Sequence, residues 1–137
     1  MLLVDVSRLR SVELHVVGYE IDPESAWLDV AGQVTVGSSC WSWQEACLTL
    51  EEAERLGEWL VAASSGPPDE LDLMFVEQDL CVRFIAATAE TVTLDWDLPA
   101  ADGAKNTSSR VRISTPRSEL LSAVHEWRSG LAALPDR

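Results

Sequence analysis

The chain has 137 residues, is 47% hydrophobic and carries a formal net charge of −13, which fits one compact, soluble, acidic domain spanning residues 1–137. So strong a negative charge repels nucleic acid and anionic lipid, and no apolar run approaches the ~20 residues of a membrane-spanning helix. The first residues lack the basic start of a signal peptide, so we expect a cytoplasmic protein with no membrane or nucleic-acid partner.

Alternating apolar and polar residues predict three strands in the first third of the chain, over residues 11–17, 26–36 and 40–44. The turn Gly37-Ser38-Ser39 separates the second strand from the third and predicts an antiparallel hairpin. Because only one side of the second strand is apolar throughout, one face of this hairpin should cover a core.

The best-marked element is a helix over about residues 50–63. Thr49 is followed three residues later by Glu52, the spacing of a capping box in which each side chain accepts the other residue's backbone N–H. The sequence Ser64-Ser65-Gly66-Pro67-Pro68 ends the helix. Its apolar stripe is expected to be Ala53, Leu56, Leu60 and Ala63, and its outward residues Glu51, Glu52, Glu54, Arg55 and Glu58.

Four further strands are predicted in the second half of the chain, over residues 71–76, 80–86, 92–98 and 110–114. The close spacing of the first three, over residues 71–98, indicates an antiparallel meander. A second helix follows over about residues 116–134, with Thr115 as its expected cap, Pro116 at its first position and a buried stripe of Leu120, Val124, Trp127, Leu131 and Leu134. The prediction is therefore an α+β fold, with an antiparallel sheet of about seven strands, one helix inserted mid-sheet and one at the C-terminus.

Catalytic and metal-binding motifs are not found in the sequence. It has no phosphate-binding glycine-rich loop, no nucleophile elbow and no paired histidine or cysteine spacing typical of a metal site. His15 and His125 have no motif around them and are expected to be ordinary surface residues, while Cys40, Cys47 and Cys81 are expected to be buried free thiols. We therefore expect a protein that is not an enzyme and that uses no metal and no cofactor.

The six tryptophans fall into two groups. Four of them lie on or beside predicted apolar faces, where packing in the core is the expected role: Trp27, Trp59, Trp96 and Trp127. Trp41 and Trp43 share one side of a short strand beside a turn. Exposed tryptophans are typical of binding hot spots, whereas a pair at this spacing also covers a helix, so the sequence leaves both roles open for these two.

The charge is distributed unevenly along the chain. Between residues 19 and 78 thirteen acidic residues stand against Arg55 alone, whereas residues 105–137 carry six basic and three acidic residues. A surface this acidic would be attracted to a basic protein, although acidity also serves solubility alone.

Several segments between residues 11 and 84 resemble the WapI-type immunity proteins. The residues that carry the resemblance are Val12-Glu13-Leu14, Gly18-Tyr19, Trp27-Leu28, Trp41-Ser42-Trp43-Gln44, Ala46-Cys47-Leu48-Thr49, Glu52-Ala53-Glu54, Trp59-Leu60, Leu73, Phe75, Glu77 and Asp79-Leu80. The resemblance implies a small acidic bacterial protein that protects its producer from the nuclease domain of a wall-associated polymorphic toxin.

From this resemblance and the charge we hypothesise a non-enzymatic binding protein whose partner is a basic toxin domain, most simply a nuclease whose substrate groove accepts carboxylates in place of phosphates. The alternative is a binding module for a small molecule or carbohydrate. The candidate partner-binding residues are Asp22, Glu24, Trp41, Trp43, Glu51, Glu54 and Glu58.

Overall fold

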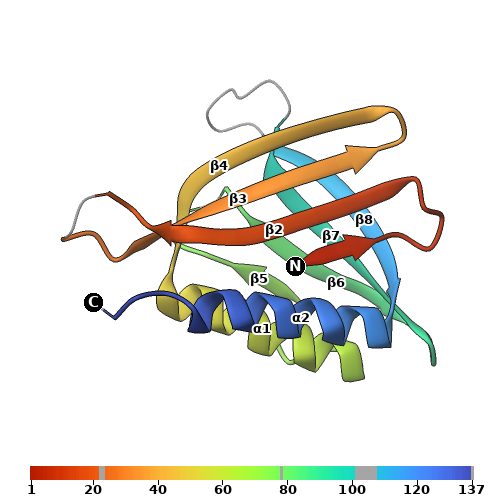
Figure 1. The fold of residues 1–137 in the computed structure, drawn as a ribbon. Coiled ribbons are helices and arrows are strands. Elements are labelled where there is room, and N and C mark those ends of the chain that lie inside the picture. The colour runs from red at the N-terminus through yellow and green to blue at the C-terminus, as the bar shows by residue number, and fades with distance from the viewer. Residues whose placement is uncertain (22–23, 78, 101–107, 137) are drawn as a thin grey trace.

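The computed structural model describes all residues except 22–23, 78, 101–107 and 137. The described residues form eight strands and two helices (Figure 1). In chain order these are β1 (Leu2–Val4), β2 (Arg10–Tyr19), β3 (Trp27–Val36), β4 (Ser39–Thr49), α1 (Leu50–Ser65), β5 (Asp72–Met74), β6 (Cys81–Ala87), β7 (Thr91–Pro99), β8 (Ser108–Pro116) and α2 (Arg117–Ala132).

The first four strands form one antiparallel sheet in the order β1-β2-β3-β4. The predicted hairpin is confirmed, because Val36 pairs with Ser39 across a turn in which Gly37 has a φ of +61°. A left-handed conformation at this position suits glycine, which has no Cβ to clash with the backbone. The strand β4 is longer than the predicted residues 40–44 and runs to Thr49, directly before α1.

The last four strands form a second antiparallel sheet in the order β5-β6-β7-β8, in which β5, β6 and β7 form the predicted meander and β8 extends it. Asp5, in the turn after β1, joins the two sheets: its Oδ1 accepts a hydrogen bond from the backbone N–H of Ser114 on β8 at 2.7 Å. Burial alone would raise the pKa of Asp5, but hydrogen bonds from Ser114 and Ser7 outweigh it and lower the pKa.

The capping box at the start of α1 is confirmed. Glu52 N–H donates to Thr49 Oγ1 at 3.2 Å, and Thr49 N–H donates to Glu52 Oε2 at 3.0 Å. The prediction that Glu52 points outward is wrong, because its other carboxylate oxygen accepts from Val76 N–H at 3.0 Å and the side chain is buried. This residue therefore ties the helix start to the segment after β5.

The start of α2 differs from its prediction. Pro116 occupies the N-cap position, no side chain caps the helix, and the hydroxyl of Thr115 is buried without a hydrogen-bond partner. The first turn of α2 is fixed instead by Arg117, whose guanidinium donates to the carbonyls of Ser64 at the end of α1 and Thr88 in the turn before β7. The contact places the end of α1 beside the start of α2.

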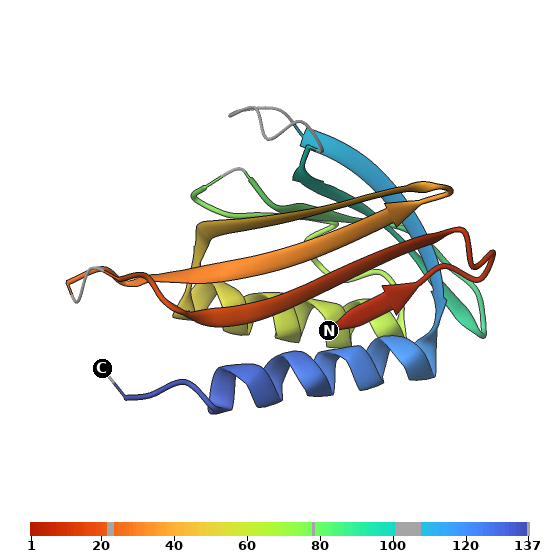
Figure 2. The ribbon, with the colours of Figure 1, turned by 45° about the horizontal axis from the view of Figure 1, so that its top comes forward.

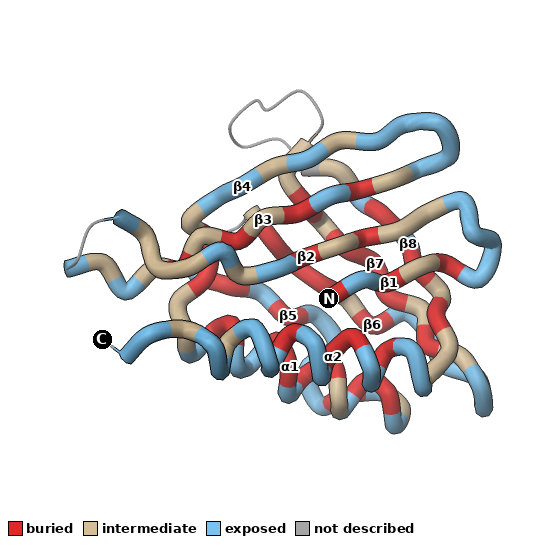
Figure 3. Tube along the Cα trace, in the orientation of Figure 1, coloured by how far each residue is buried: buried red, intermediate tan, exposed pale blue. Residues whose placement is uncertain are grey.

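The two helices lie side by side and antiparallel along one side of the pair of sheets (Figures 1 and 2). The inner faces of both sheets and the apolar stripes of both helices share one hydrophobic core. Figure 3 shows the buried residues where the sheets and the helices face each other. Trp59, Trp96 and Trp127 belong to this core as predicted, and Trp27 is half-buried.

The predicted α+β class and both helices are confirmed. The described residues add one short strand, β1, to the expected seven, and they divide the strands into two sheets of four. Trp41 links these sheets, because its Nε1 donates to the carbonyl of Pro99 at the end of β7 at 3.1 Å.

Candidate functional site

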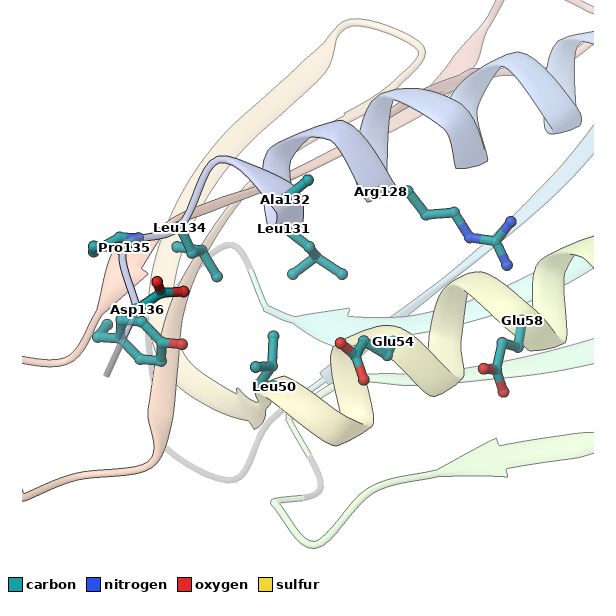
Figure 4. A pocket seen from close by; sticks show the side chains of 10 residues that line it. Leu50, Glu54, Glu58, Arg128, Leu131, Ala132, Leu134, Pro135 and Asp136 are labelled. Atoms are coloured by element: carbon teal, nitrogen blue, oxygen red, sulfur yellow. The ribbon is translucent and has the colours of Figure 1, made fainter.

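Two hollows lie at the end of the molecule where α1 begins and α2 ends. The larger, here called the helix groove, has a volume of about 710 Å³ and opens between the two helices (Figure 4). Its lining comprises Tyr19 of β2, Leu50, Glu54 and Glu58 of α1, Arg128, Leu131 and Ala132 of α2, and Leu134, Pro135 and Asp136 after α2.

The helix groove combines an apolar floor with charged walls. Glu54 and Glu58 are one helical turn apart on the outer face of α1, so both carboxylates stand on the same wall. Figure 4 shows the side chain of Leu131 pointing from α2 toward α1, between Leu50 and Glu54. These two leucines are half-buried and pack against the hydrophobic core.

The smaller hollow, here called the loop groove, has a volume of about 510 Å³. Glu24 and Glu51 line it, together with Ser25, Ala26 and Thr49. Tyr19 and Leu50 line both grooves, so the two hollows adjoin at these residues. Four of the carboxylates proposed from the sequence, those of Glu24, Glu51, Glu54 and Glu58, are thus gathered around one end of the molecule.

The three exposed carboxylates of α1 have no cationic partner among the described residues. No ion pair in the described part of the chain involves Glu51, Glu54 or Glu58. Several arginines are occupied elsewhere: Arg112 donates twice to Asp95, at 2.7 and 3.0 Å, and Arg110 donates to Asp97 at 3.1 Å. Two of the six basic residues near the C-terminus, Arg110 and Arg112, are therefore paired with acids of β7, away from the grooves.

Arg55, the one cation in the acidic part of the sequence, also turns away from the grooves. Its guanidinium donates to the carbonyl of Met74 at 2.7 Å and lies over the ring of Phe75, 5.4 Å from the centroid. Among the residues that the structure describes, Arg128 is the single base lining the helix groove, and its side chain crosses α1 at Gly57. The helix groove therefore holds three carboxylates against one guanidinium.

The structure places the two candidate tryptophans away from both grooves. Trp43 is half-buried and its indole covers Gly32, where an added Cβ would come within 2.3 Å of the ring. Trp41, on β4, is half-buried and is held by the hydrogen bond from its Nε1 to the carbonyl of Pro99. Both side chains thus contribute to packing between the sheets, and the remaining candidate, Asp22, lies outside the described residues.

Sequence reasoning missed the apolar part of the helix groove. Leu131 and Leu134 continue the stripe of α2 and were expected in its buried face, but both are half-buried and line the groove. Arg128 and Asp136 also line it, together with Tyr19, which comes from a strand near the opposite end of the chain. In the sequence, only Gly130 indicates where the apolar stripe of α2 leaves the core. It comes directly before Leu131, the first residue of this stripe that is only half-buried.

The other reactive side chains lie away from the grooves. Cys47 and Cys81 are buried free thiols as predicted, and burial raises the pKa of Cys47 to about 12. The prediction of burial is wrong for Cys40, which is exposed because it lies on the outer face of the edge strand β4. His15 and His125 are both exposed, as expected for surface residues.

Two features are absent from the described residues, a metal-binding cluster and a membrane-spanning helix. No group of three or more histidines, cysteines or acidic residues in the described part of the chain is arranged to hold a metal ion. Neither helix in this part is long and apolar enough to span a membrane.

The fold and the two grooves define a small acidic α+β protein with a concave, carboxylate-lined surface at one end. The chain belongs to the Immunity protein WapI-like family, whose model matches residues 6–135. This match extends over nearly the whole chain, well beyond the residues 11–84 that carried the resemblance. No curated protein and no solved structure matches the chain.

Proposed function

We propose that this protein is an immunity protein that neutralises a cognate toxin domain by direct, non-covalent contact. Membership of an immunity-protein family supports this function. The structural observation that carries it is that Glu51, Glu54 and Glu58, which line the two adjoining grooves, form no ion pair within the described part of the chain. Carboxylates without partners in the free protein are available to pair with a cationic surface.

The partner that fits this surface is a basic protein domain, and a nuclease is the simplest candidate. A nuclease binds the phosphates of its substrate in a cationic groove, and carboxylates can occupy the same positions. Opposite charges also speed the encounter, because they raise the association rate between partners at low ionic strength. The acidic end of this protein would then block the active site of the toxin by covering it.

The test is co-expression with a candidate nuclease toxin domain, sought in the reading frames beside this gene, which the wild-type protein should render harmless. Changing Glu51, Glu54 and Glu58 together to lysine should abolish protection. Each substitution replaces a negative charge by a positive one, so the net charge of this surface changes by six units. All three side chains are exposed, so the variant should fold.

A matched control changes three other exposed acids, Asp69, Glu90 and Glu119, to lysine. The net charge changes equally, and each triple includes one residue in the first turn of a helix, Glu51 in α1 or Glu119 in α2. These control residues lie toward the opposite end of the helices, where α1 ends and α2 begins. Protection that survives the first triple, or fails equally in both, would contradict the proposed binding surface.

A titration with simple sugars monitored by tryptophan fluorescence separates this function from carbohydrate binding. We expect no saturable change, because Trp41 and Trp43 are packed against the core. A saturable change with a defined stoichiometry would favour the alternative function.

A further inference from the structure

The floor of the helix groove is an apolar surface that an aliphatic side chain of a partner can cover. It is lined by Leu50, Leu131 and Leu134, which pack against the hydrophobic core from their other side. Such a floor is held in place before any partner arrives, and a preformed site loses little side-chain entropy on binding. An aliphatic chain lying across these leucines would remove apolar surface from water.

The walls of the same groove carry a net negative charge. Glu54 and Glu58 stand on the α1 side, and Asp136 lies at the end of the groove near Leu134 (Figure 4). Arg128 enters from the α2 side, but no ion pair joins it to either glutamate among the described residues. Both glutamates are exposed at the rim of the groove and can meet a cation from outside.

Only a long basic side chain satisfies both features at once. A purely apolar side chain would strip water from the glutamates without pairing them, and an acidic one would be repelled. Lysine and arginine combine an aliphatic stem with a charged head, and the planar guanidinium of arginine can donate two parallel hydrogen bonds to one carboxylate. The floor fits the stem and the α1 wall fits the head.

We propose that the helix groove is a socket for one long basic side chain, arginine in preference to lysine, presented by the toxin. The stem lies on Leu50 and Leu131, and the guanidinium pairs with Glu54 and Glu58. The identity of the partner rests on the proposed function, whereas the chemical selectivity of the socket belongs to this chain and is testable without the toxin. A central, partly desolvated arginine is also a frequent hot spot in protein interfaces.

The experiment compares two capped tripeptides, Gly-Arg-Gly and Gly-citrulline-Gly, which have similar shapes and differ in charge. Binding is followed by NMR from the methyl signals of Leu50 and Leu131. We expect the arginine peptide to give saturable shifts with a Kd near the millimolar range, and the citrulline peptide to bind at least about tenfold more weakly. Equal shifts from both peptides, or no saturable shift from the arginine peptide, would overturn the assignment.

Two double variants test whether the arginine peptide binds in this groove. Glu54→Gln with Glu58→Gln keeps the shape of the wall and removes its charge, so the arginine peptide should lose about tenfold or more in affinity. Glu90→Gln with Glu119→Gln removes the same charge elsewhere and should leave the Kd unchanged. An equal loss in both pairs would show that net charge, and not the socket, attracts the peptide.

Measurements with the toxin domain keep this inference apart from the proposed function. If the arginine peptide binds the groove but no toxin is neutralised, the proposed function fails and the socket stands. If a toxin is neutralised and the Glu54→Gln, Glu58→Gln pair weakens neither peptide nor toxin binding, the socket fails and the function stands. If that pair weakens both by similar factors, the toxin uses the socket as proposed.

Discussion

Replacing Glu52 by glutamine tests how the start of α1 is stabilised. Both carboxylate oxygens of Glu52 accept backbone hydrogen bonds at 3.0 Å, one from Thr49 and one from Val76. Glutamine has a single acceptor oxygen, so in either orientation its NH₂ group must face one of these N–H donors. One part-buried N–H is left unsatisfied, and the remaining bond loses its charged acceptor.

The expected decrease in the free energy of unfolding follows from these two losses. An unsatisfied buried donor costs about 1–3 kcal/mol, and replacing a charged acceptor by a neutral one adds about 1 kcal/mol, giving about 2–4 kcal/mol in total. For 137 residues the unfolding entropy is about 0.3 kcal/mol/K, so the melting temperature should fall by about 7–14 °C.

The control is the neighbouring substitution Glu51→Gln. Glu51 is exposed in the same first turn of the helix and takes no part in the capping box. It should lose only its interaction with the helix dipole, about 0.3–1 kcal/mol. Thermal unfolding followed by circular dichroism measures both variants. Similar melting temperatures for the two variants would refute the account of Glu52.

Three further predictions follow from individual contacts. Gly32→Ala should destabilise the protein by about 3 kcal/mol or more in urea unfolding, because the new Cβ would lie 2.3 Å from the Trp43 ring, and adding Trp43→Leu should recover part of the loss. In the folded protein, iodoacetamide should modify Cys40 alone, since hydrogen bonds to its sulfur lower its pKa while burial raises the pKa of the other two thiols; adducts at all three with similar rates would contradict this. Hydrogen bonds from Arg112 lower the pKa of Asp95, so the stability from this pair is complete above the ordinary carboxyl pKa of 3.8 and is lost as the pH falls through the lowered value. Unfolding free energies of wild type and Asp95→Asn should therefore differ by a constant amount above about pH 4 and converge below it, and a gap that persists in acid would count against the pair.

Features encoded locally were predictable from the sequence. The capping box, the glycine turn between β3 and β4, and the breaker sequence after α1 depend on residues within a few positions of one another. Glu52 shows the limit of such patterns. Its spacing to Thr49 predicted the cap, but its bond to Val76 spans 24 positions and could not be read from the helix alone.

The division into two sheets and the helix groove were beyond the sequence patterns. Alternation shows which side of a strand is apolar but not which strand lies next to it, so β4 and β5 could not be assigned to separate sheets. The groove depends on where α2 ends relative to α1, which is set by packing at both ends of the helices. Charge and resemblance suggest the three exposed glutamates of α1, Glu51, Glu54 and Glu58, whereas the leucines beside them emerge only from the structure.

The most direct test of the acidic binding surface is the rate at which the toxin domain associates with the protein, measured by stopped flow over a range of salt concentrations. The account predicts that lysines at Glu51, Glu54 and Glu58 lower this rate more than about tenfold at low ionic strength, with a gap that narrows as salt screens the charges. Lysines at Asp69, Glu90 and Glu119 should lower it much less. Equal rates for the two triple variants at every salt concentration would contradict the claim that the grooves are where the toxin binds.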